Sequence, residues 1–168
     1  GRLIQPLTGE YDVVTNAAVR LQPVGDKLPT THLDSGMAEA FTHLQAQGRD
    51  FAHKLVIVLT DGVPNNVLNA TTVQSYVAGV GADSQYFYPD ANAPPLPNYP
   101  GYPVQEFYNA PLMRARMMYK DRESNGLRGW EVFGVGLGYG ARVDLLEKMS
   151  RLGGTAKYGL ELTAGGNP

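Results

Sequence analysis

Residues 54–62 read Lys-Leu-Val-Ile-Val-Leu-Thr-Asp-Gly, and this stretch decides the fold. Leu55 to Leu59 form an unbroken apolar run of β-favouring residues. The run is too short for a stable helix and is typical of a central strand buried on both faces. Ligands of open α/β sheets bind at the carboxyl ends of parallel strands, so Asp61 is the first candidate functional residue. The alternative, equally open, is that Asp61 only caps a turn, because Asp-Gly is a common turn dipeptide.

Length and composition narrow the function classes. The 168 residues correspond to a single domain that is large enough to bury a core. The chain has 14 Lys and Arg residues and 16 Asp and Glu residues, and its basic residues do not form a run. Nucleic acid is therefore not an expected partner, because no basic stretch is present to neutralise its phosphates. The absence of cysteine excludes disulfides, thiolate metal sites and cysteine nucleophiles. No stretch is long and apolar enough to span a membrane, and the start at Gly1 without a signal peptide suggests a piece of a longer protein.

Hydrophobic spacing predicts strands that alternate with helices. The helices are expected at residues 12–21, from Thr30 or Thr31 over roughly 14 residues, and at 67–80, 111–123 and 141–152. Besides the central strand, strands are expected at 2–8, 130–137 and 155–162. This alternation predicts an α/β fold: a doubly wound, mostly parallel sheet with helices on both faces.

Residues 81–109 break the alternation with tyrosines, phenylalanines and prolines that follow neither the strand nor the helix period. We interpret the segment as a Tyr/Pro-rich insertion within the domain of residues 1–168, because long structureless loops are uncommon in compact domains. Its aromatic side chains either form a contact surface, or the segment is a loop that they hold against the body of the domain or that is partly disordered. The second interpretation is favoured.

Three stretches, in this order, resemble successive signatures of the von Willebrand factor A domain. They are Thr31-His-Leu-Asp-Ser-Gly36-Met37-Ala-Glu-Ala40, Leu55-Val-Ile-Val-Leu-Thr60-Asp61-Gly62 and Val132-Phe-Gly-Val-Gly-Leu-Gly138. The resemblance covers about residues 1–80 and 128–162 and implies a Rossmann-like sheet. It also implies that Thr31 and Asp61 are ligands in a metal-ion-dependent adhesion site (MIDAS) for Mg²⁺, or for Mn²⁺ or Ca²⁺. Oxygen ligands from a hydroxyl and a carboxylate suit such hard cations.

The same resemblance implies a rim around the metal site and a partner. The rim residues would be His32, Gly62, Asn65 and Asn66. The open metal position would accept a carboxylate from a protein ligand. The family opens with a strand ending in Asp-x-Ser-x-Ser, which supplies the other metal ligands, and this motif does not occur in the sequence. The amino-terminal strand is therefore expected to be absent, and an upstream segment or a second chain is expected to complete the sheet and the metal site.

Within that family, Gln5-Pro6-Leu7-Thr8, followed by a helix and by Thr-x-Leu-x-x-Gly-Met, resembles the A domains of bacterial Tad-type pilus-assembly proteins. This resemblance implies an extracytoplasmic location, in the cell envelope or secreted, and a role in cell adhesion or pilus assembly. The expected function is protein binding without catalysis, so no catalytic residue is predicted.

Two other functions stay open. Residues 136–141 fit Gly-x-Gly-x-x-Ala after a strand and before a helix, which is the dinucleotide-binding fingerprint, although its place near the carboxyl end is unusual. The chain would then be a nucleotide-dependent enzyme. In the other alternative the domain is a scaffold with a degenerate metal site that acts through its insertion. Hydrolytic chemistry from His32, Asp34 and Ser35 is not expected, because neighbouring helical residues point in different directions.

Overall fold

The computed structural model describes residues 5–6, 8–19, 31–89 and 104–156. These residues form a mixed α/β domain, as the alternation of predicted strands and helices indicates. Its elements, in chain order, are α1 (Tyr11–Val19), α2 (Leu33–Gln47), β1 (Leu55–Thr60), α3 (Ala70–Ala78), the 3₁₀ helix η1 (Gly81–Tyr86), α4 (Val104–Arg116), the π-helical turn η3 (Met117–Asp121), α5 (Arg122–Ser124), β2 (Glu131–Gly136) and α6 (Val143–Leu152).

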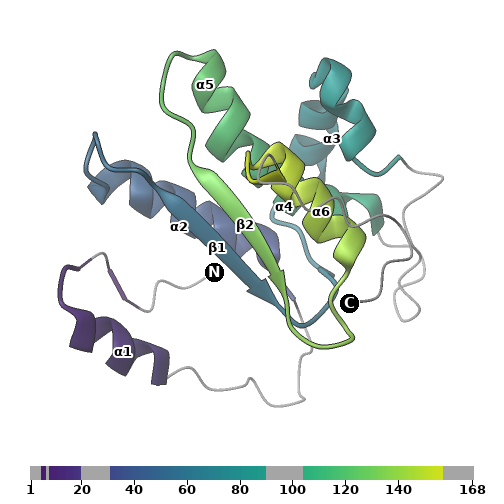
Figure 1. Cartoon of the computed structure of the whole chain (residues 1–168). Coiled ribbons are helices and arrows are strands. Elements are labelled where there is room, and N and C mark those ends of the chain that lie inside the picture. The colour runs from purple at the N-terminus through teal and green to yellow at the C-terminus, as the bar shows by residue number, and fades with distance from the viewer. Residues whose placement is uncertain (1–4, 7, 20–30, 90–103, 157–168) are drawn as a thin grey trace.

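The two described strands form a parallel pair in which Leu55 lies opposite Glu131 and Thr60 opposite Gly136. Figure 1 shows β1 and β2 side by side, with α4 and α6 beside them. Parallel pairing agrees with the prediction, since strands joined by helical crossovers run in the same direction. Both strands therefore end at the same edge, and the loops after Thr60 and Gly136 are neighbours.

Burial along β1 alternates strictly. Val56, Val58 and Thr60 are buried, and the two valines join the core with residues of α2, α4 and α6. Leu55, Ile57 and Leu59 are 53%, 62% and 62% exposed. The prediction that β1 is buried on both faces is thus wrong for the part of the chain that the structure describes. The reason is that the described helices α2, α4 and α6, which share that core, cover the face of Val56 and Val58 only.

Helix α4 is the centre of the core and starts earlier than predicted. It begins at Val104, so Pro111 lies inside the helix rather than in its first turn. A proline there removes one backbone hydrogen bond. The helix tolerates it because Phe107, Tyr108 and Leu112 are almost completely buried, and this apolar burial outweighs the lost bond. The predicted helical end near Glu123 is confirmed, since α4 continues through η3 and α5.

Both ends of the predicted insertion at 81–109 are helical and contribute to the core. Residues 81–86 form η1, Phe87 and Tyr88 belong to the core, and residues 104–109 belong to α4. The Asn109 side chain joins the two ends, because it accepts a hydrogen bond from the Tyr88 N–H and donates one to the Tyr88 carbonyl. These contacts agree with the interpretation in which aromatic side chains hold the segment to the body. Residues 90–103 lie outside the described part.

The remaining boundaries differ by a few residues from the predicted ones. His32, rather than Thr30 or Thr31, caps α2, since its Nδ1 accepts a hydrogen bond from the Ser35 N–H. Most of the predicted strands at 2–8 and 155–162 falls outside the described residues. Helix α1 matches the predicted helix at 12–21, but none of its residues is buried.

Among the described residues, no helix combines the length and apolarity that crossing a bilayer requires.

Candidate functional site

Two loops meet where β1 ends, and hydrogen bonds lock them together. The Thr31 N–H, just before α2, donates to Asn65 Oδ1 at 2.8 Å. The Asn65 N–H, in the loop after β1, donates back to the Thr31 carbonyl at 3.2 Å. This reciprocal pair fixes the start of α2 against the loop that follows Asp61. The predicted site residues Thr31 and Asn65 are therefore in direct contact.

The turn at Asp61-Gly62 is shaped by Thr60 and by Thr31. The Thr60 hydroxyl donates to the Gly62 carbonyl at 3.0 Å and accepts from the Gly62 N–H at 3.3 Å. A Cβ atom at Gly62 would come within 3.1 Å of Thr31 Oγ1, so the Thr31 hydroxyl lies beside the Gly62 backbone. The Asp61 side chain is exposed and makes no hydrogen bond or ion pair with other described residues. Its carboxylate is thus available to a ligand.

The glycine-rich turn at 137–141 forms the other side of this edge. The Leu137 N–H donates to the Thr60 carbonyl at 2.8 Å. Gly140 lies so close to the backbone of Asp61 that a Cβ atom there would sit 2.2 Å from the Asp61 carbonyl oxygen. Tyr139, in the same turn, is fully exposed. Tyr139 occupies a variable position of the pattern at 136–141, and only the packing of this turn places its neighbour Gly140 against Asp61.

His32 and Asn66, the other two predicted rim residues, serve the local backbone. His32 uses Nδ1 as the cap of α2. Asn66 Oδ1 accepts a hydrogen bond from the Val67 N–H at 2.8 Å. Both residues lie next to the locked pair of Thr31 and Asn65 in sequence. Each of these two side chains therefore stabilises the backbone conformation of its loop by accepting a hydrogen bond from a nearby N–H.

The oxygen donors at this edge suit a divalent cation but do not complete a site for it. Mg²⁺ requires six oxygen ligands in octahedral geometry, some of them water. The predicted protein ligands here are the Thr31 hydroxyl and the Asp61 carboxylate. Within residues 5–6, 8–19, 31–89 and 104–156 no three His, Cys, Asp or Glu side chains gather into a group that could hold a metal ion. An ion at this edge would need further ligands from elsewhere.

The glycines of the dinucleotide-like turn are explained by packing within the chain. A Cβ atom at Gly136 would lie 2.8 Å from the Ala141 Cβ, and Gly140 packs on Asp61. Helix α6, which follows, carries Asp144 in its first turn, paired with Arg142 at 2.9 Å. A carboxylate at a helix amino end competes with a phosphate for the same positive end of the helix dipole.

Asp34, which the sequence placed near His32 and Ser35, is a buried structural anchor. It is 1% exposed, and it accepts hydrogen bonds from Arg114 Nε at 2.7 Å and from the Leu68 N–H at 2.9 Å. It therefore ties α2 to α4 and to the loop before α3. Arg114 is 80 residues away in sequence, and no local pattern predicts the pair.

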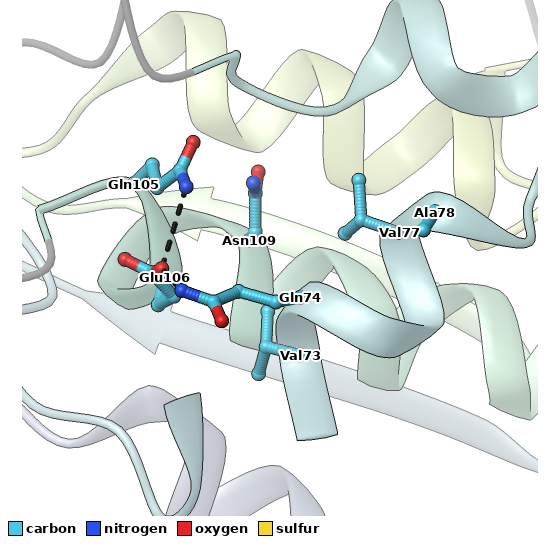
Figure 2. Close-up of a pocket in the computed structure, with 7 residues that line it drawn as sticks. All are labelled: Val73, Gln74, Val77, Ala78, Gln105, Glu106 and Asn109. Atoms are coloured by element: carbon cyan, nitrogen blue, oxygen red, sulfur yellow. Dashed lines mark hydrogen bonds between the residues drawn. The ribbon is translucent and has the colours of Figure 1, made fainter. Parts of the chain in front are cut away.

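A separate cavity of about 240 Å³ lies between α3 and α4, on different residues from the edge at Asp61 (Figure 2). Seven residues line it: Val73, Gln74, Val77, Ala78, Gln105, Glu106 and Asn109. Sequence reasoning missed it, because residues 105, 106 and 109 fell in the predicted insertion. The only local sequence signal for this cavity is the adjacent polar pair Gln105 and Glu106.

Comparison of the chain with protein-family models, with curated proteins and with solved structures gives no match.

Proposed function

We propose that this domain binds a protein ligand, without catalysis, at the edge where β1 and β2 end. The observation that carries the proposal is the locked pair of loops at Thr31 and Asn65, which presents an exposed Asp61 carboxylate. A binding surface benefits from such preorganisation, because little conformational entropy is lost when the ligand docks. Loops above the carboxyl ends of parallel strands are also the usual ligand sites of α/β sheets.

The proposal extends to a divalent cation, Mg²⁺ or Mn²⁺, held at this edge. Thr31 and Asp61 supply two oxygen ligands in the proposed site. Water and a segment that completes the sheet supply the others, and a carboxylate of the protein ligand takes the open position. Support comes from the position of the Thr31 hydroxyl beside Gly62, the residue that follows Asp61. Further support comes from the Asp61 carboxylate, which no other described residue engages.

The finer parts of the proposal rest on sequence resemblance. They are a doubly wound sheet of the von Willebrand A type with helices on both faces, an extracytoplasmic location, and a role in adhesion or pilus assembly. The three ordered stretches around Thr31, Asp61 and Val132 support them. The parallel strand pair agrees with such a sheet but is common to many α/β folds.

Paramagnetic Mn²⁺ tests the metal part of the proposal directly. Mn²⁺ is titrated into ¹⁵N-labelled protein, first alone and then with the segment that completes the sheet. With that segment present, bound ion should selectively broaden the amide signals of Thr31, Gly62 and Asn65. The D61A variant should lose this broadening, because it removes the exposed carboxylate. The matched control is D50A, which removes another exposed carboxylate, between α2 and β1, and should leave the broadening unchanged.

The results separate the proposal from its runner-up, a scaffold domain without a functional metal site. Broadening that is spread over all exposed carboxylates, or that persists in D61A, excludes a metal site at this edge. The incomplete set of described oxygen ligands is the observation that favours the scaffold. If that result is obtained, protein binding would have to depend on the exposed side chains alone, with Tyr139 and Asp61 as the first to replace.

A further inference from the structure

Glu106 is a buried carboxylate that the proposed function does not use. It lies in the first turn of α4 and is 2% exposed. Its Oε1 accepts hydrogen bonds from Gln74 Nε2 and, at 3.3 Å, from Gln105 Nε2. Its Oε2 is buried and has no hydrogen-bond partner among the described residues. Figure 2 shows the side chains of Gln74, from α3, and Gln105 converging on Glu106.

A buried carboxylate oxygen without a partner needs an explanation, because nearly all buried polar atoms in proteins are hydrogen-bonded. In a capping box, a glutamate at the third position of a helix accepts a hydrogen bond from the N–H of the residue before the helix. Here that residue is Pro103, which has no N–H. Residues 90–103 also contain no lysine, arginine or histidine that would pair with the charge.

The cavity of about 240 Å³ beside Glu106 has one polar and one apolar side. Gln74 and Gln105 both direct their amide nitrogens to Glu106 Oε1, and Figure 2 shows their carbonyl oxygens on opposite sides of Glu106. The Asn109 amide is already used by the Tyr88 backbone. The polar side therefore offers the Glu106 carboxylate, whose Oε2 has no partner among the described residues. Val73, Val77 and Ala78 form the apolar side.

We propose that this cavity binds a primary alkylammonium group. An ammonium donates hydrogen bonds and accepts none, which suits the Glu106 carboxylate with its unpartnered Oε2. Its alkyl chain packs against Val73 and Val77. The source is either a small free amine or the end of a lysine side chain on another protein. This site is independent of the edge at Asp61, since the two share no residue.

The experiment compares n-butylammonium with its neutral isostere 1-butanol. Each is titrated into ¹⁵N,¹³C-labelled protein near neutral pH. Butylammonium should cause saturable shifts of the Gln74 and Gln105 side-chain amides and of the Val73 and Val77 methyl groups. Butanol should not, because it lacks the charge. In the E106Q variant the affinity for butylammonium should fall about tenfold or more, through loss of the charge-assisted bond. E39Q, at an exposed glutamate of α2, is the control and should bind normally.

A second arm with Nα-acetyl-lysine N-methylamide identifies the source of the amine. Binding of this compound at the same residues assigns the site to a lysine side chain, and binding of butylammonium alone assigns it to a free amine. Equal shifts with butanol, no saturable shifts, or unchanged affinity in E106Q would overturn the proposal. The comparison of butylammonium with butanol needs only the unmodified protein, so the test stands even if E106Q does not fold.

Discussion

At the scale of the residue, two buried carboxylates differ in whether their oxygens have hydrogen-bond partners. Asp34 and Glu106 are both almost completely buried. Each oxygen of the Asp34 carboxylate has a partner, Arg114 Nε for one and the Leu68 N–H for the other. Glu106 has one oxygen without a partner among the described residues. A satisfied buried charge indicates an anchor, whereas an unsatisfied buried polar atom needs an explanation, and the proposed ammonium site supplies one for Glu106.

The anchor role of Asp34 predicts a large stability effect when its partner is removed. R114M should destabilise the protein by about 3 kcal/mol, because the Asp34 carboxylate stays buried without its countercharge. Urea unfolding measures the change, with R128M as the control at an exposed arginine, where the expected change is within about 0.5 kcal/mol. Replacing both partners, as D34L with R114M, should recover part of the loss. Equal effects of R114M and R128M would contradict the anchor role.

At the scale of the element, a charge network joins η1, α3 and the helical run from α4 to η3. Asp83 of η1 accepts from Arg116 Nε at 2.9 Å and from Lys120 Nζ at 2.5 Å. Tyr76 of α3 donates to Asp121 at 2.5 Å. The π-helical turn carries Lys120 and Asp121, which supply one cation and one anion to the network. This network fixes the residues that lead into the buried pair Phe87 and Tyr88.

The network predicts how stability depends on pH. Burial alone would raise the pKa of Asp83, but hydrogen bonds and charges from Lys120 and Arg116 outweigh burial and hold the pKa below its ordinary value of 3.8. A lowered pKa in the folded state means that the stabilisation is complete above the unfolded pKa near 4. It is lost as the pH falls through the folded pKa. D83N should therefore be less stable than the unmodified protein at about pH 7, and the difference should shrink towards about pH 2.5.

Urea midpoints measured over this pH range test that expectation. The control is D50N, at an exposed carboxylate without a partner among the described residues, which should keep the pH dependence of the unmodified protein. A stability difference between D83N and the unmodified protein that stays constant from neutral to acid pH would show that the Asp83 charge does not stabilise η1.

Single elements also show what the sequence could predict. Helices α2 and α6 and both strands were predicted within a few residues, because their apolar periods are local properties of the chain. The start of α4 and the packing of Phe87 and Tyr88 could not be predicted. They depend on the Asn109–Tyr88 hydrogen bonds and on core contacts between distant segments. The neighbourhood of Thr31 and Gly62 followed from the predicted topology. The cavity at Glu106 could not, because it exists only where α3 packs against α4.

At the scale of the whole molecule, strand β1 is covered on one face only. Leu55, Ile57 and Leu59 on β1 and Val135 on β2 leave an exposed apolar surface on the other. Parallel sheets in α/β proteins are usually covered on both faces. The outer edge of β1 has no strand partner among the described residues, and the strand carries neither a charge nor a proline that would protect it. Such a surface is where the proposed sheet-completing segment would pack.

This asymmetry predicts opposite responses to substitutions at adjacent positions of β1. V58A removes a buried side chain, 7% exposed, and should cost about 2 kcal/mol in urea unfolding. I57A removes more atoms, yet from a residue that is 62% exposed, so it should cost less than about 0.5 kcal/mol in this chain. If a further segment of the protein covers this face, the I57A cost should rise to about 2–4 kcal/mol once that segment is present. An equally large cost of I57A and V58A in the 168-residue chain itself would mean that residues outside the described part already cover the face, and that no additional segment is needed to complete the fold.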